Sequence, residues 1–266
     1  MSAKLKVKRP NSIILGVYGC TTSYSYVNEE LYTFIRNNLR AYLDQNWSDK
    51  KLNYLIDRIE KQTQLDHASG EKNAPSIVRK TESQFKQSLI ENINWRMQRP
   101  MYKYSPLMTL FDWMWADGYK NGTLKSHIYP DVPKCLAHWR MHLFIKLFSV
   151  AVADASGQKL FFQSTIHGDL TKNFNNYIQF TLENRKLASF YRILISLVRD
   201  EPKNLLFLTA NLEEALAAKS VGIVCIIIDR PENEKYTTTE LNGIQTASSF
   251  DDIEFIEDPN SPAPCC

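Results

Sequence analysis

Short apolar runs alternate with helical stretches in the second half of the chain, and this alternation limits the folds open to it. Residues 221–228 are almost continuously apolar and β-branched, and residues 143–152 and 205–208 are similar runs. Apolar residues at helical spacing occupy 186–199 and 213–219, between these runs. Apolar strands that alternate with helices are typical of a parallel sheet covered on both faces. We therefore expect an α/β protein.

A further apolar run near the start leads into a loop rich in glycine and threonine. Residues 13–15 are Ile-Ile-Leu, and the loop after them contains Gly16, Thr21 and Thr22. In an α/β protein such a loop lies at the carboxyl end of a strand, where ligands bind. No charged side chain and no histidine occurs over residues 10–28. The loop has the position of a binding site without the usual catalytic side chains.

A long helical block separates this first strand from the other apolar runs. Apolar and aromatic residues recur at helical spacing between residues 29 and 123, and a polar stretch at 62–80 is interpreted as a loop. The sequence predicts an α/β core of residues 1–28 and 124–258, with an inserted helical domain of residues 29–123. Residues 259–266 are expected to form a flexible tail.

Composition and charge place the chain among ordinary globular proteins. Of the 266 residues 44% are hydrophobic and 23% are charged, and 32 basic and 29 acidic residues give a net charge of +3. This balance does not favour a nucleic-acid partner. No apolar run approaches the roughly 20 residues that span a bilayer, so no transmembrane segment is expected. We predict a cytoplasmic location, with the nucleus as an alternative, and interpret the basic start as a solvated leader.

Several cysteines and histidines have both a chemical and a structural interpretation. Cys20 lies in the first loop, but the arginine that a cysteine phosphatase needs shortly afterwards is absent, so packing is favoured. His138 and His142 share one helix face without a third metal ligand, so an exposed helix face is favoured over a metal site. Cys265 and Cys266 resemble the lipidated tails of Rab-type GTPases, but no P-loop accompanies them; lipidation and exposed thiols remain alternatives.

Hydroxyl and basic side chains near the predicted strand ends are candidates for binding an anion. Thr21 and Thr22 offer hydroxyls and backbone N–H groups, which can bind an anion or instead cap the following helix. Ser149 lies near the end of a strand, and Arg185 and Lys186 open a helix. A hydroxyl and a cation from separate strand ends can converge on a phosphate.

Motifs distributed over nearly the whole chain resemble the haloacid dehalogenase superfamily, and within it the enolase-phosphatases of methionine salvage. The most specific are the following: Gly19 with Thr21, Thr22 and Val27; Met114 and Trp115 through Gly122 and Lys125; Tyr129 with Asp131; Gln158 and Leu160 with Gly168 and Asp169; Leu206 through Thr209; and Arg230 through Asn233. The resemblance implies a Rossmann-like core with a helical cap inserted after the first motif.

The chain departs from this family at its acidic positions. The family's first strand ends in Asp-x-Glu-Gly-Thr, whose aspartate is expected to attack phosphorus and hold Mg²⁺, and Gly16 and Tyr18 stand at the two acidic positions. Ala210 stands where the family has a third acidic ligand, with Glu214 retained nearby. Glycine cannot form an aspartyl-phosphate, and Mg²⁺ requires oxygen ligands. The resemblance therefore implies no intact catalytic residue and no bound metal.

The resemblance also assigns the substrate-binding positions. The family's Ser-Ser-Gly substrate loop falls at Ser149 and Val150, and its lysine falls at Arg185 or Lys186. Together with Thr21 these are the predicted ligands for the phosphate of a substrate. We expect a phosphorylated small molecule or another anion as ligand, and the sequence identifies no protein partner.

Two functions follow from these departures. The first is an enolase-phosphatase-like protein without Mg²⁺-dependent phosphatase activity that serves as a binding or regulatory module. The alternative is an active Mg²⁺-dependent enzyme that converts 2,3-diketo-5-methylthiopentyl-1-phosphate to the dihydroxy-keto-pentene product and releases phosphate. That alternative needs substitute carboxylates, for which Asp154, Asp169 and Glu214 are the candidates.

Overall fold

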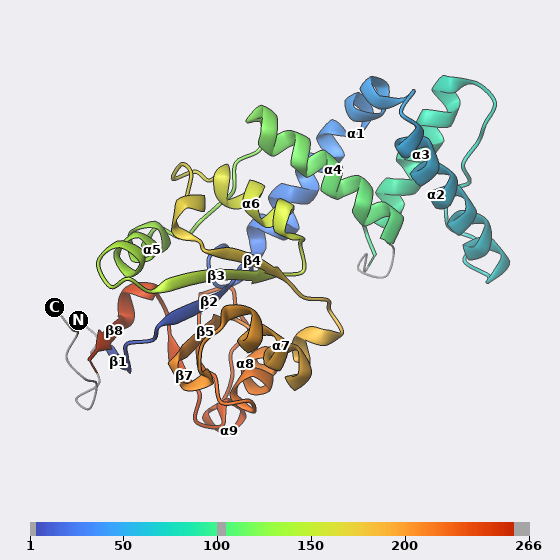
Figure 1. Cartoon of the computed structure of the whole chain (residues 1–266). Helices are drawn as coiled ribbons and strands as arrows, with labels where there is room; N and C mark the ends of the chain where they lie inside the picture. The colour runs from blue at the N-terminus through green and yellow to red at the C-terminus, as the bar shows by residue number, and fades with distance from the viewer. Residues whose placement is uncertain (1–3, 100–104, 258–266) are drawn as a thin grey trace. The chain divides into compact units, whose positions relative to one another are not determined.

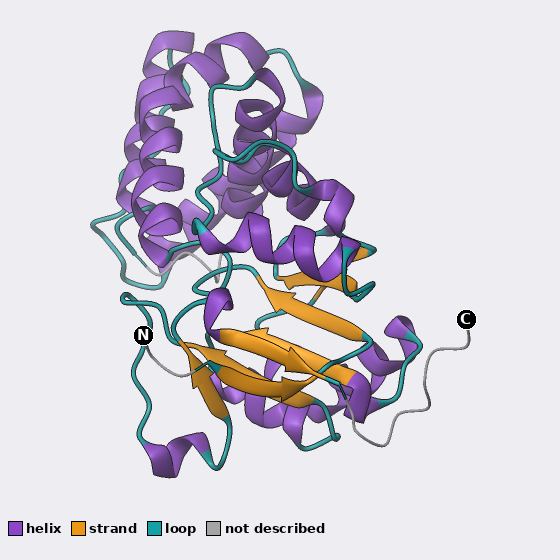
Figure 2. Cartoon of the chain, turned by 90° about the vertical axis from the view of Figure 1, so that its left-hand side faces the viewer, coloured by secondary structure: helices purple, strands orange, loops and turns teal. Residues whose placement is uncertain are grey.

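The computed structural model describes residues 4–99 and 105–257. The chain divides into two compact units, one made of residues 1–27 and 125–266 and the other of residues 28–124. The first unit contains the sheet, and the described part of the second consists of helices and loops (Figure 2). The predicted α/β fold class is confirmed.

A six-stranded parallel sheet forms the centre of the first unit, in the order β4-β3-β2-β5-β6-β7. Its strands are β2 (Ser12–Gly16), β3 (Lys146–Ala151), β4 (Asn176–Gln179), β5 (Leu205–Thr209), β6 (Val224–Ile228) and β7 (Gln245–Ala247). β2 and β5 are buried along their whole length. This burial explains their continuous apolar sequences, because a central parallel strand meets helices on both faces.

Helices cover both faces of this sheet (Figure 1). α7 (Ala188–Val198) and α8 (Leu212–Lys219) pack on one face against Ile14, Val150 and Phe207. α5 (Asp131–Met141) and α6 (Ala155–Gln163) lie on the other face. The short elements of this unit are η3 (Thr171–Asn173), η4 (Asn184–Lys186), η5 (Pro202–Asn204), α9 (Thr238–Leu241) and η6 (Phe250–Asp252).

The basic start of the chain forms a strand, so its interpretation as a solvated leader was wrong. β1 (Leu5–Lys8) pairs in parallel with β8 (Ile253–Ile256), and Arg9 N–H donates to Ile256 O at 2.9 Å. The lysines of β1 alternate with Leu5 and Val7, and Val7 is buried. Alternation of this kind fits a strand with one covered face, a pattern that the high charge concealed.

The second unit is built from helices around its own apolar core. η1 (Tyr26–Leu31) is a π-helical turn that leads into α1 (Tyr32–Asn46), and α2 (Lys50–Ala68), α3 (Glu82–Arg96) and α4 (Ser105–Asn121) follow. The core side chains come from all four α-helices. The predicted loop at 62–80 was wrong in its first part, because α2 continues to Ala68.

A buried polar network explains that extension of α2. Arg96 donates to Thr63 Oγ1 at 3.0 Å and to Asp66 Oδ2 at 2.7 Å, and Asn92 Nδ2 donates to Thr63 Oγ1 at 2.9 Å. These polar residues form the inner face of α2 and α3, so their polarity does not mark a loop. Over residues 4–99 and 105–257, no helix is both long and apolar enough to cross a membrane.

Candidate functional site

The carboxyl ends of three neighbouring strands bring together positions that lie far apart in the sequence. Gly16 of β2 pairs with Val150 of β3, while Leu15 pairs with Leu208 of β5. Thr209 therefore lies beside Gly16, and a Cβ placed on Gly16 would be 3.6 Å from Thr209 Oγ1. This edge of a parallel α/β sheet is where ligands bind. Positions 16, 150 and 209 therefore lie together at the carboxyl ends of their strands.

The loop after β2 folds back on its own backbone. Thr21 donates to Val17 O through both its N–H, at 2.9 Å, and its Oγ1, at 3.0 Å, and Thr22 N–H donates to the same oxygen at 3.2 Å. Gly19 N–H donates to Thr22 O at 2.8 Å, and Tyr18 forms a β-bridge with Thr22. Thr21 is fully buried. The Thr21 hydroxyl and the N–H groups of Thr21 and Thr22, predicted to bind an anion, therefore donate to an acceptor inside the loop.

His127 joins this loop to the segment that precedes α5, a contact that the sequence did not predict. Its Nδ1 lies 3.1 Å from Thr22 Oγ1 and accepts from Ser23 N–H at 3.3 Å. Because a backbone N–H only donates, Nδ1 is the acceptor and carries no proton. The histidine follows no catalytic or metal-binding spacing, so only the three-dimensional fold identifies it.

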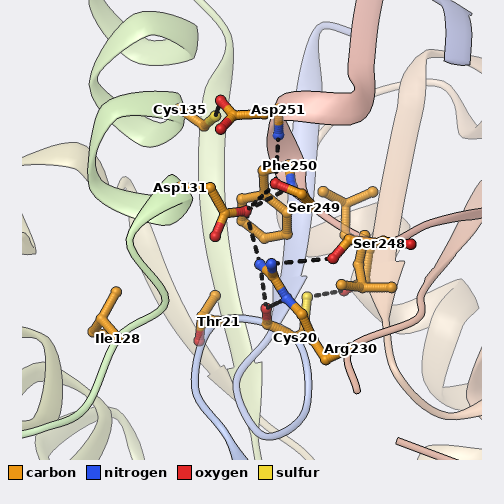
Figure 3. A network of polar contacts seen from close by, with 12 residues as sticks. Cys20, Thr21, Ile128, Asp131, Cys135, Arg230, Ser248, Ser249, Phe250 and Asp251 are labelled. Atoms are coloured by element: carbon orange, nitrogen blue, oxygen red, sulfur yellow. Dashed lines mark hydrogen bonds and ion pairs between the residues drawn. The ribbon is translucent and has the colours of Figure 1, made fainter. Parts of the chain in front are cut away.

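Three side chains, which we call the loop clamp, hold the same loop from outside: Asp131, Arg230 and Asn233. Arg230 donates to Cys20 O from Nε at 3.4 Å and from Nη2 at 3.3 Å, and Asn233 Nδ2 donates to Gly19 O at 2.7 Å. Figure 3 shows Arg230 between Asp131 and the Cys20 carbonyl. These bonds fix the backbone of the loop.

Asp131 balances the buried charge of Arg230. Its Oδ2 accepts from Arg230 Nη2 at 2.9 Å, from Ser249 Oγ at 2.9 Å and from Phe250 N–H at 2.7 Å. Burial by itself raises the pKa of Asp131, but the hydrogen bonds and charge of Arg230, with the other two donors, hold that pKa below its usual value. The guanidinium also lies 4.1 Å from the centre of the Tyr129 ring. Arg230 and Asp131 thus form a buried, charge-balanced ion pair within the loop clamp.

A second buried ion pair lies at the strand ends. Glu214 Oε2 accepts from Thr209 Oγ1 at 2.7 Å, and Glu214 Oε1 accepts from Arg185 Nη1 at 3.0 Å. The side chain of Glu214 is 6% exposed and that of Arg185 is 25% exposed. Burial raises the pKa of Glu214, against the hydrogen bond from Thr209 and the charge of Arg185. Arg185 is thus the predicted anion ligand that the structure brings to the neighbourhood of Gly16.

The side chains around this ion pair limit its chemistry. Burial and the charge of Glu214 raise the pKa of Tyr24 to about 12, so this phenol stays protonated at neutral pH. Lys186 forms an ion pair with the exposed Glu213. Of the two positions predicted for the family's lysine, Arg185 pairs with a buried carboxylate next to the strand ends and Lys186 pairs with one at the surface.

Ser149 faces the opposite side of the sheet from Arg185. Its Oγ donates to Gln158 Oε1 at 2.7 Å, and Gln158 Nε2 donates to Ala153 O and Ile178 O at 2.8 and 2.9 Å. Gln158 belongs to α6, whereas Glu214 belongs to α8 on the other face. The structure therefore does not bring the Ser149 hydroxyl to Arg185, because Ser149 faces α6 whereas the neighbouring Val150 faces α7 and α8.

The candidate substitute carboxylates have local partners. Asp154 Oδ1 caps α6 by accepting from Gly157 N–H at 2.7 Å, and Asp169 Oδ1 accepts from Thr171 N–H and Oγ1 at 2.8 and 2.6 Å. Gly16 and Ala210 offer no side-chain oxygen. Within residues 4–99 and 105–257, no group of three or more His, Cys, Asp or Glu side chains could hold a metal ion. The residues present do not fit the Mg²⁺ site that the family implies.

The remaining candidates from the sequence are cysteines and histidines. Cys20 is fully buried, its Sγ–H points to Leu208 O at 3.4 Å, and burial raises its pKa far above the usual value, which does not favour a nucleophile. The rings of His138 and His142 lie 5.5 Å apart. Cys265 and Cys266 lie outside the described residues.

Comparisons with known proteins agree with this architecture. The UTR4 protein of Saccharomyces cerevisiae matches with a TM-score of 0.67 at 19% identity, over 91% of this chain and 99% of that one. A dehalogenase with an intermediate complex matches with a TM-score of 0.51 at 12% identity, over 92% of this chain and 96% of that one. The chain has the α/β fold of these two proteins, a dehalogenase-like fold.

Sequence relatives narrow the class to one family. Enolase-phosphatase E1 of Xenopus tropicalis is 30% identical over 245 residues, which cover 91% of this chain and 94% of that protein. The Dictyostelium discoideum protein of the same name is 30% identical over 257 residues, covering 91% of this chain and 95% of the relative. No family model matches the chain. The chain belongs to the enolase-phosphatase E1 family.

Proposed function

We propose that this protein is an enolase-phosphatase-like protein without Mg²⁺-dependent phosphatase activity, and that it acts as a binding or regulatory module. The observation that carries the proposal is the composition of the strand ends. Gly16 and Ala210 stand at the positions of the family's attacking and metal-binding carboxylates, and Glu214 is already held by Thr209 and Arg185.

The chemistry of phosphate transfer supports this proposal. A covalent phosphoenzyme needs a nucleophilic side chain, and Gly16 has none. The negative charge that builds on the transferred group needs a metal ion or fixed cations to stabilise it. Arg185 supplies one cation, but its charge is balanced by Glu214 at 3.0 Å. Tyr18 is a poor base near neutral pH, because a phenol ordinarily has a pKa of about 10.

The same edge supports a role in binding. Arg185 is partly exposed beside the strand ends, and Tyr191 Oη holds its backbone by donating to Arg185 O at 2.8 Å. A fixed guanidinium is a suitable ligand for phosphate or carboxylate groups. We propose that the ligand is a phosphorylated small molecule or another anion, bound through Arg185 rather than through Thr21 or Ser149.

Phosphate release from 2,3-diketo-5-methylthiopentyl-1-phosphate, with and without Mg²⁺, tests the loss of activity. The wild type should be silent in both conditions. A triple variant Gly16→Asp, Tyr18→Glu, Ala210→Asp should gain Mg²⁺-dependent release. A Cβ on Gly16 would approach no closer than 3.4 Å to Leu208 O, which is an ordinary contact, so the backbone accepts a side chain there.

A matched control separates metal binding from nucleophilic attack. The double variant Tyr18→Glu, Ala210→Asp restores two acidic positions but leaves Gly16 unchanged, so it should remain silent. Mg²⁺-dependent turnover by the wild type at a rate comparable to an active relative would overturn the proposed function.

A further inference from the structure

The Arg185–Glu214 ion pair has a consequence for the ligand of this site. Arg185 is held from its backbone, since Arg185 N–H donates to Thr181 O at 3.1 Å and Tyr191 Oη donates to Arg185 O at 2.8 Å. Its guanidinium reaches the first turn of α8, where Nη1 donates to Glu214 Oε1 at 3.0 Å. The cation at the strand ends is therefore engaged by an anion that belongs to the protein.

Glu214 is equally fixed. Its second carboxylate oxygen accepts from Thr209 Oγ1 at 2.7 Å, and its N–H donates to the capping side chain of Asn211 at 3.0 Å. The side chain is only 6% exposed. A carboxylate held by two donors in a fixed geometry cannot swing away without leaving donors unsatisfied. An external anion must compete with it.

We infer that Glu214 is an internal competitor for anions at Arg185: its carboxylate accepts a hydrogen bond from the guanidinium and weakens the binding of phosphate groups at the strand ends. This inference rests on the proposed binding function, because it concerns the ligand of that same edge. It makes Glu214 an affinity-limiting residue: a phosphorylated ligand or another anion that binds through Arg185 has to displace this carboxylate or share the guanidinium with it.

The balance of charge at this edge supports the inference. When Glu214 is ionised, it and Arg185 carry opposite unit charges, so the pair presents no net charge to an approaching anion. In a Mg²⁺-dependent relative the metal would add positive charge, but the residues of this chain do not fit a metal. A phosphate group near Arg185 would also be repelled by Glu214. Removing the negative charge leaves the Arg185 guanidinium as a donor for the phosphate.

The test compares variants of the full chain by isothermal titration with inorganic phosphate in buffer without divalent cations. Glu214→Gln removes the charge and keeps an oxygen that can accept from Thr209. It should bind phosphate at least about tenfold more tightly than the wild type, the scale of one charge-assisted hydrogen bond. The matched control is Glu213→Gln, in the same helical turn, whose carboxylate is 60% exposed and pairs with Lys186. It should bind like the wild type.

Two further measurements keep the inference open to refutation. The double variant Arg185→Gln, Glu214→Gln should lose the gained affinity, because the gain depends on the released guanidinium. If Glu214→Gln does not fold, Glu214→Ala replaces it with the same expectation. Equal phosphate affinity of the wild type and a folded Glu214 variant would overturn the inference, as would a gain that survives loss of Arg185. Phosphate release by the wild type refutes the proposed function in a separate assay.

Discussion

Replacing Asp131 with asparagine tests the physical account of the loop clamp. Asp131 Oδ2 accepts from Arg230, Ser249 and Phe250 at distances between 2.7 and 2.9 Å. Asparagine has nearly the same shape and retains one acceptor oxygen, so packing changes little. The charge changes, however, and the Arg230 side chain, which is 5% exposed, loses the carboxylate that neutralises it.

The expected cost follows from this burial. Removing one partner of a buried ion pair costs about 3–5 kcal/mol, because the other charge is left uncompensated in a poorly solvating environment. The ring faces of Tyr129 and Phe250, at 4.1 and 5.4 Å from the guanidinium carbon, offset a small part of this loss. We therefore expect Asp131→Asn to lower the free energy of unfolding by about 3 kcal/mol.

Urea denaturation at pH 7, followed by circular dichroism, measures this change. The matched control is Asp229→Asn, which removes the carboxylate of an exposed pair whose Lys235 and Asp229 side chains are 59% and 36% exposed. That variant should lose about 1 kcal/mol or less. If both variants lose the same small amount, Asp131 does not compensate a buried charge and the electrostatic account of the loop clamp is wrong.

The stability of wild type and Asp131→Asn as a function of pH gives the same experiment a second readout. The pKa of Asp131 lies below its usual value in the folded protein. A depressed pKa contributes stability that is present above the unfolded-state pKa and is lost as pH falls through the folded-state pKa. The difference in stability between wild type and Asp131→Asn should therefore be constant near neutral pH and shrink below about pH 4. A difference that grows on acidification would contradict this sign.

Further substitutions test individual contacts, with urea denaturation as the readout unless stated. Gly19→Ala should lower the free energy of unfolding by more than about 2 kcal/mol, because φ is +72° and a Cβ would lie 2.5 Å from a carbon of the Tyr24 ring. Gly122→Ala is the matched control: φ is +79°, but a Cβ would have nothing within 4 Å, so the loss should be about 1 kcal/mol. If both glycine variants lost the same free energy of unfolding, a clash with Tyr24 would make no contribution. Ser149→Ala should cost about 1–3 kcal/mol, since its partner Gln158 loses a buried donor at 2.7 Å. Cys20 should resist alkylation in the native protein, as peptide mapping would show, because its thiol is buried with a raised pKa.

The sequence predicts the sheet well where strands are central and poorly where they lie at an edge. β2, β5 and β6 are continuous apolar runs, because helices cover both of their faces. β1 is half lysine and β4 contains Asn, Tyr and Gln, so neither shows an apolar run. Their strand character depends on partners that are distant in the sequence, and periodicity within a short segment does not reveal them.

For the candidate site, the sequence predicts where residues lie better than which of them contact one another. The rule that parallel strands end at one edge correctly places Gly16, Val150 and Thr209 together. It does not tell which face each side chain takes, so Ser149 was grouped with Arg185 although it bonds to α6. The pairing of Arg185 with Glu214 joins η4 to α8, and no spacing in the sequence encodes it.

The contacts of the loop clamp hold the loop after β2 independently of the side chains at positions 16 and 210. Arg230 and Asn233 donate to the carbonyl oxygens of Cys20 and Gly19, and Asp131 compensates the buried arginine. Backbone carbonyls are present whatever side chain occupies position 16 or 210, so the loop conformation does not require carboxylates there. The loop clamp therefore holds this loop through its backbone, and none of these hydrogen bonds uses the side chain at position 16 or 210.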